Sequence, residues 1–182
     1  MPRVAPITGK SDVPSEHHAL VDKVLKVFGG VRGPFSMLLH SPKMAERLFS
    51  LGDFYREECI VELRLRVLAI LVAARERQGA YVWAAQINAA RRAGVREEAI
   101  DLIRAKADPS RFPVEEREIV TYAEQLMRTN RVDQAAFDAL KNRYGVQWLI
   151  ELTAVTNYYG LLCGIVSAFE VSPPSDGDRL PA

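Results

Sequence analysis

Cysteine and histidine, the side chains that most often carry thiol, proton-transfer or metal chemistry, are scarce in this chain. Its 182 residues include two cysteines, Cys59 and Cys163, and three histidines, His17, His18 and His40. The cysteines lie far apart in the sequence, which argues against a disulfide framework or a cysteine-rich metal site. Adjacent histidines on a helix point in different directions, which argues against a shared metal site. We therefore expect no metal ion and no cofactor.

The chain also lacks an excess of charge of either sign and a long apolar run. Lys and Arg number 24 against 23 Asp and Glu, so the net charge is +1. This balance gives no electrostatic reason to bind nucleic acid or an acidic membrane. The longest apolar run, residues 67–74, is too short to span a bilayer, and the N-terminus shows no apolar leader. We expect a soluble, cytoplasmic protein with no nucleic-acid or membrane partner.

No segment alternates apolar and polar residues between hairpin turns, so strands are not expected. Proline is absent from residues 43–108 and 114–172, and the two stretches are joined by a turn with Pro109 and Pro113. Long proline-free stretches favour helices. Because 48% of the residues are hydrophobic, a packed core is expected. The fold class is therefore all-α, with about seven or eight helices.

Helix boundaries can be read from capping residues. We expect a helix over residues 80–93 that ends at Gly94, and another that begins after Asp133 and stops at Gly145. Residues 147–169 are apolar nearly all round, which predicts a central or interface-buried helix.

Most of the prolines lie near the ends of the chain, and this suggests where the domain begins and ends. Six of the ten are found before residue 15 or after residue 172. We expect flexible tails over residues 1–15 and 172–182, and a single domain over residues 16–171.

Neither cysteine has the surroundings of a reactive thiol. Cys59 follows Glu57 and Glu58, and nearby carboxylates raise a thiol pKa. Cys163 stands in an apolar helix and is expected to be a small buried hydrophobic residue. More informative is the segment after the apolar run, where Tyr81 and Trp83 offer large amphipathic surfaces. On residue types alone, two packed helices with aromatic spacers are the preferred interpretation of this segment.

Several separated blocks keep the order and spacing of a known signature: Arg66-Val67-Leu68-Ala69-Ile70-Leu71, Tyr81-Val82-Trp83-Ala84-Ala85-Gln86 and Ala93-Gly94-Val95. With Gly33-Pro34-Phe35, Leu39-His40-Ser41-Pro42 and Tyr158-Tyr159-Gly160, these blocks resemble the carboxymuconolactone decarboxylase and alkylhydroperoxidase D family over about residues 28–170. Of the two branches of this family, the decarboxylase-type branch is the one that these blocks resemble more. The resemblance implies a helical bundle of the alkylhydroperoxidase D-like type.

The family's reactive residues are replaced at every matching position. The peroxidase branch uses a Glu, a Cys-x-x-Cys pair and a His, and these fall on Val67, Gly79, Val82 and Gln86. The decarboxylase branch uses a Glu at two of these positions and the same His. We call Val67, Gly79, Val82 and Gln86 the relay positions. Valine transfers no proton, and glutamine has no useful pKa near neutrality.

The resemblance leaves three functional hypotheses. The first is a divergent enzyme acting on a small cyclic or carboxylated metabolite. The second is a non-catalytic ligand-binding or scaffold protein, and the third, held lowest, is a thiol peroxidase. An apolar pocket with a few polar groups would suit a small molecule. The candidate catalytic residues are Gln86, Tyr81 and His40, and the candidate substrate-binding residues are Trp83, Arg75, Asn157 and Tyr158.

Self-association is also implied by the resemblance. Relatives commonly form a trimer, or a hexamer of two trimers, and a dimer is the next expectation. The apolar sequence over residues 153–169 is consistent with a buried inter-subunit surface, although one chain could bury it internally.

Overall fold

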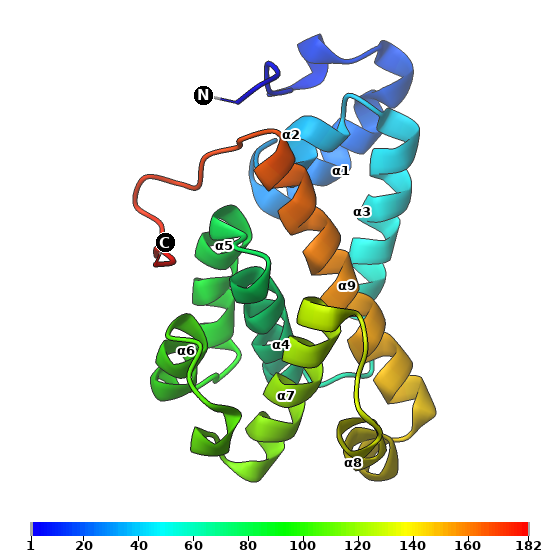
Figure 1. Cartoon of the computed structure of the whole chain (residues 1–182). Coiled ribbons are helices and arrows are strands. Elements are labelled where there is room, and N and C mark those ends of the chain that lie inside the picture. Colours follow the sequence, from blue (N-terminus) through cyan, green and yellow to red (C-terminus); the bar gives the residue numbers. More distant parts are fainter. Residues whose placement is uncertain (1, 182) are drawn as a thin grey trace. The chain divides into compact units, whose positions relative to one another are not determined.

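The computed structural model describes residues 2–181, and every regular element within them is helical (Figure 1). Nine α-helices and three short 3-10 helices are present in this part of the chain. The all-α prediction is confirmed. The five-residue helix α2 (Pro34–Leu38) is too short to be recognised from periodicity and was not predicted.

The chain divides into two compact units. One comprises the residues up to Cys59 together with Ile165–Ser172, and the other comprises Ile60–Gly164 and the C-terminal segment from Pro173. The expectation of a single domain over residues 16–171 stays a prediction.

The first unit is built around aromatic side chains. Its main helices are α1 (His18–Phe28) and α3 (Pro42–Glu57), and the rings of Phe28, Phe35 and Phe49 pack with centroids 5.4 to 6.2 Å apart. The Arg56 guanidinium lies 5.3 Å from the ring centroids of Phe28 and Phe49. Such contacts stabilise a small core beyond the burial of apolar area alone.

The second unit is organised around α4 (Leu63–Glu76), which lies between α5 (Ala80–Arg92) and α7 (Val114–Thr129) (Figure 1). All residues from Leu65 to Arg75 are buried. A helix buried on every side must be apolar all round, which explains the uninterrupted apolar run in its sequence.

The helix expected to be central, α9 (Val146–Ala168), is less enclosed than α4. Val146 and Ile150 are 57% and 62% exposed. Among the described residues, α9 is the helix long and apolar enough to cross a membrane by length and composition. Half of the apolar window is buried inside the protein. The cytoplasmic location stays a prediction.

The capping predictions are confirmed. The Asp133 carboxylate accepts a hydrogen bond of 2.8 Å from the Ala136 amide at the start of α8 (Gln134–Tyr144). Gly94 follows α5 with a φ of +80°, a backbone conformation that L side chains rarely adopt. A short helix α6 (Glu97–Arg104) then returns the chain to α4.

Candidate functional site

The turn between α4 and α5 positions the first of the relay positions. Gln78 takes the left-handed conformation with a φ of 52°, and the Gly79 amide donates to the Ala74 carbonyl at 2.7 Å. Gly79 itself has a φ of −79°, which any residue can adopt. A glycine at this position therefore needs an explanation other than backbone freedom.

Packing supplies that explanation. A Cβ atom added to Gly79 would lie 2.2 Å from the Cys163 Sγ and 2.9 Å from the Cys163 Cβ. Both distances are shorter than real Cβ contacts allow. The sulfur of Cys163 thus fills the space that a side chain at position 79 would need.

The Cys163 thiol is an inert filler of this space. It is fully buried, and desolvation raises its pKa to about 12 despite the opposing field of Arg77. The thiolate, which is the nucleophile in thiol chemistry, is therefore strongly disfavoured at neutral pH. This agrees with the interpretation of Cys163 as a buried hydrophobic residue.

Three of the relay positions share one face of α5, because residues 79, 82 and 86 follow helical spacing. Val82 is buried with an exposed fraction of 3%, and Val67 on α4 is buried with 2%. Gln86 is partly exposed, so its amide is the polar group that this face offers. The face can donate and accept hydrogen bonds, but it carries no acid, base or nucleophile.

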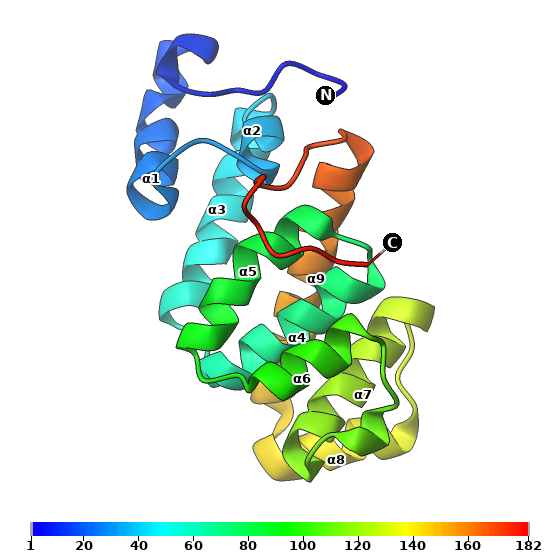
Figure 2. The same ribbon diagram turned by 90° about the vertical axis from the view of Figure 1, so that its left-hand side faces the viewer.

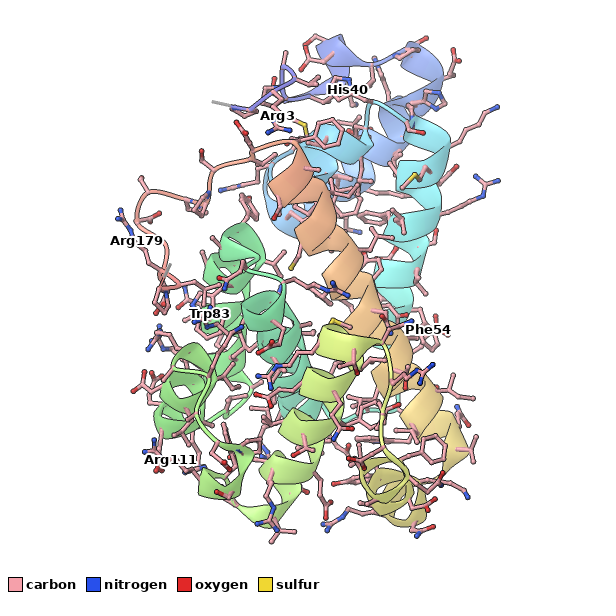
Figure 3. The ribbon with its side chains drawn as sticks, viewed as in Figure 1. Arg3, His40, Phe54, Trp83, Arg111 and Arg179 are labelled. Carbon is pink, nitrogen blue, oxygen red and sulfur yellow. The ribbon has the colours of Figure 1, made fainter. Side chains whose placement is uncertain are left out.

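Trp83 follows Val82 on α5, about 100° around the helix, and lies one turn from both Gly79 and Gln86. Its side chain, labelled in Figure 3, is fully buried, and its indole Nε1 donates to the Asp178 carboxylate at 2.9 Å. The Arg104 guanidinium lies 5.6 Å from the Trp83 ring centroid. The structure therefore brings Trp83 together with Arg104 and Asp178.

Arg75 is buried at the end of α4 and is bound to main-chain and side-chain groups nearby. Its Nε donates to the Arg104 carbonyl at 2.8 Å, and its Nη1 donates to the Gln78 amide oxygen at 3.0 Å. These contacts hold the end of α6 against the α4–α5 turn. A role of Arg75 in substrate binding stays a prediction.

Two further candidates lie on α9. The Asn157 amide donates to the Thr153 carbonyl of its own helix at 3.0 Å. Tyr158 is buried, and its ring contacts Tyr159 edge-on at 5.4 Å. Tyr81, on the first turn of α5, is half-buried. Their contributions to ligand binding or catalysis stay predictions.

The third catalytic candidate, His40, belongs to the first unit, whereas Gln86 and Tyr81 belong to the second. The exposed His40 ring donates from Nε2 to the Ala5 carbonyl at 2.9 Å (Figure 3). This contact fastens the N-terminal segment to the end of α2, which is a structural task. A catalytic role of His40 stays a prediction.

Sequence reasoning missed Asp178 and Arg104. Asp178 lies in a segment with the composition of a linker, where no apolar residue indicated an attachment point. Its attachment is polar, and pairing between residues so far apart leaves no local signal. Among residues 2–181, no group of three or more His, Cys, Asp or Glu side chains could hold a metal ion.

The comparisons with known proteins give a family model and a fold. Residues 42–125 match the model of the Carboxymuconolactone decarboxylase family. No curated protein matches the chain significantly.

Solved structures with the same fold are similar over nearly the whole chain. An alkylhydroperoxidase AhpD core protein of Ralstonia eutropha, described as uncharacterized and peroxidase-related, is 18% identical, with a TM-score of 0.73 and 95% of each chain covered. The debrominase Bmp8, solved as a variant with 2,3,4-tribromopyrrole, is 17% identical, with a TM-score of 0.75 and 96% of this chain and 93% of that chain covered.

A protein of unknown function from Agrobacterium tumefaciens is also 17% identical, with a TM-score of 0.67, and the match covers 76% of this chain and 96% of that one. Identities this low establish the fold alone. The family model and the fold agree: residues 42–125 match the model of the carboxymuconolactone decarboxylase family, and the chain has an alkylhydroperoxidase D-like fold.

Proposed function

We propose that this chain is a divergent family member that binds a small cyclic or carboxylated metabolite and converts it without the Glu/Cys/His relay. The observation that carries the proposal is the set of side chains at the relay positions, none of which ionises near neutral pH. Val67 and Val82 are buried, and the space beside Gly79 is filled by a thiol with a pKa of about 12. These positions therefore offer no reactive thiol for the reduction of a peroxide.

The class of ligand follows from what the face around Gln86 offers. The partly exposed amide of Gln86 can form hydrogen bonds with a carbonyl, hydroxyl or carboxyl group of a compact ring. The debrominase with the same fold was solved with tribromopyrrole, a small aromatic ring. This supports a ring-shaped ligand without identifying it. Tyr81 is our candidate for the group that supplies a proton in any turnover.

A non-catalytic binding protein is the second candidate. It is favoured by the buried valines at positions 67 and 82, because a valine side chain cannot ionise. An enzyme would change its ligand, whereas a binder would only be stabilised by it.

A thermal-shift screen with cyclic carboxylic acids and their neutral analogues tests both candidates. Each ligand that raises the melting temperature is then incubated with wild type and Tyr81→Phe and followed by NMR. Conversion by wild type that is reduced in Tyr81→Phe supports the enzyme. Stabilisation without conversion supports the binder. If no compound of these classes stabilises the protein, the proposal is wrong.

We also propose that the chain self-associates, as a trimer or hexamer first and as a dimer next. The α8–α9 surface supports this. Val146, Ile150 and Phe137 line an apolar groove of about 400 Å³, and Ile150 is the most exposed large apolar side chain of the described residues. Exposed apolar patches of this kind mark protein interfaces in soluble proteins.

A further inference from the structure

The C-terminal segment from Pro173 runs along α5 (Figure 2). The segment turns at Gly177, whose amide donates a hydrogen bond of 3.0 Å to the Pro174 carbonyl. A Cβ atom on Gly177 would lie only 2.8 Å from the Ala84 Cβ. The backbone therefore passes directly over the helix, and the next side chain, Asp178, is directed at Trp83.

Asp178 is bound like a carboxylate ligand. One oxygen accepts from the Trp83 indole at 2.9 Å and from the Arg104 Nη2 at 3.2 Å, and the other accepts from the same Nη2 at 3.1 Å. Arg91 adds a longer ion pair of 3.8 Å. Hydrogen bonds between charged groups are the stronger ones in proteins, and a guanidinium matches the shape of a carboxylate.

The receiving groups are held in place without Asp178. Arg75 binds the carbonyl of Arg104 and fixes the residue that carries the guanidinium. The Glu97 carboxylate accepts two hydrogen bonds from Arg91, at 2.7 and 3.2 Å. Trp83 is packed into the core through its indole ring. A preorganised set of donors binds a charged ligand without an ordering cost.

The C-terminal segment that carries Asp178, in contrast, is loosely attached. Residues 172–176 are exposed, and the Asp178 side chain itself keeps 23% of its surface exposed. A cavity of about 260 Å³ lies beside Ala80, and the rest of its lining comes from the segment itself: Pro173, Pro174, Ser175, Asp178, Arg179 and Leu180. Arg179, which follows Asp178, is exposed (Figure 3). The segment is therefore held mainly by one carboxylate above a partly open space.

We propose that Trp83, Arg104 and Arg91 form a carboxylate-binding site that Asp178 closes from within the chain. A small organic carboxylate with a compact apolar body competes with Asp178. Its charge takes the place of the Asp178 carboxylate, and its body enters the cavity beside Ala80. The site includes none of the relay positions, and it does not depend on the function proposed for them.

Competition from within the chain predicts a weak apparent affinity in the wild type. If the segment closes the site 90 to 99% of the time, the apparent dissociation constant rises about 10- to 100-fold. Removing the Asp178 carboxylate removes this competition. The site should then bind free carboxylates more tightly, although the protein has lost an ion pair.

The test is a calorimetric titration of the full chain with benzoate, at constant ionic strength, and with benzamide as the neutral probe. We expect Asp178→Ala to bind benzoate at least 10-fold more tightly than wild type, and benzamide to bind neither protein detectably. Asp176→Ala removes an exposed carboxylate two residues upstream and should behave like wild type. Arg104→Gln, added to Asp178→Ala, should abolish benzoate binding.

Equal benzoate affinities of wild type and Asp178→Ala would overturn the proposal, and so would equal binding of benzamide and benzoate. Unchanged binding in the double variant would show that benzoate occupies another site. If Asp178→Ala does not fold, Asp178→Asn replaces it, because its amide oxygen still accepts from the Trp83 indole while the charge is gone. The same increase in affinity is expected of it.

Discussion

The contact between Gly79 and Cys163 can be tested by a double-mutant cycle. In Gly79→Ala the new methyl group would lie 2.2 Å from the Cys163 sulfur, so the α4–α5 turn or α9 must shift. Overpacking of this kind costs about 1–3 kcal/mol. For a chain of this length, that corresponds to a fall of roughly 2–12 °C in melting temperature. The backbone at Gly79 is not strained by an L residue, so the whole loss should come from the contact.

Cys163→Ala removes the sulfur and leaves a space. Alone it should cost about 1 kcal/mol, as the deletion of a buried methyl group does. In the double variant, the methyl group at position 79 enters the vacated space. The rescue is incomplete, because the Cβ of residue 163 is still 2.9 Å from the new methyl group.

We expect the double variant to be more stable than the sum of the single variants predicts, by about 1–2 kcal/mol. The assay is urea unfolding of all four proteins, followed by circular dichroism. Stabilities that add within about 0.5 kcal/mol would refute the account of this contact.

Three other outcomes are expected. Gln86→Ala should weaken binding of any ring acid found in the screen several-fold, without changing the pH dependence of its affinity, because glutamine does not titrate; Gln86→His alone should gain no decarboxylase activity. Burial raises the pKa of Glu124 above its usual 4.5. Because the carboxyl group then ionises more readily in the unfolded chain than in the folded one, the folded protein loses stability as the pH rises above 4.5. Unfolding of Glu124→Gln should therefore show a stability difference from wild type that grows in favour of the variant from pH 4.5 to pH 7, and a constant difference would contradict this. Light scattering at micromolar concentration should give a particle larger than 20.4 kDa, and Ile150→Glu should make it smaller; a wild-type monomer would contradict self-association.

Local sequence signals predicted the helices well. Periodicity and caps such as Asp133, Gly94 and Gly145 act within a few residues, so their effects are visible in the sequence itself. It was harder to predict which helix is enclosed by others, because the sequences of α4 and α9 are both apolar. Only the packing of other helices around α4, with Ile150 of α9 exposed to solvent, distinguishes the two.

The candidate site was predictable only in part. The substituted relay positions were found from the spacing of motifs along the chain. The sulfur of Cys163 beside Gly79, and Asp178 against Trp83, join residues more than 80 positions apart, and no local pattern announces such pairs. The charge of Arg75 suits contact with an anionic ligand. In the folded protein, however, its guanidinium donates hydrogen bonds to the Gln78 side chain and the Arg104 carbonyl.

The most direct test of the account is the consumption of an organic hydroperoxide with dithiothreitol as reductant. It should be measured on wild type, Cys59→Ser and Cys163→Ala, with protein-free buffer as the background. The relay positions hold no thiol, and the pKa of Cys163 is about 12. We therefore predict that all three proteins consume peroxide only at the background rate. Rapid consumption by wild type that disappears in Cys59→Ser or in Cys163→Ala would contradict the central claim that this protein carries out no thiol chemistry.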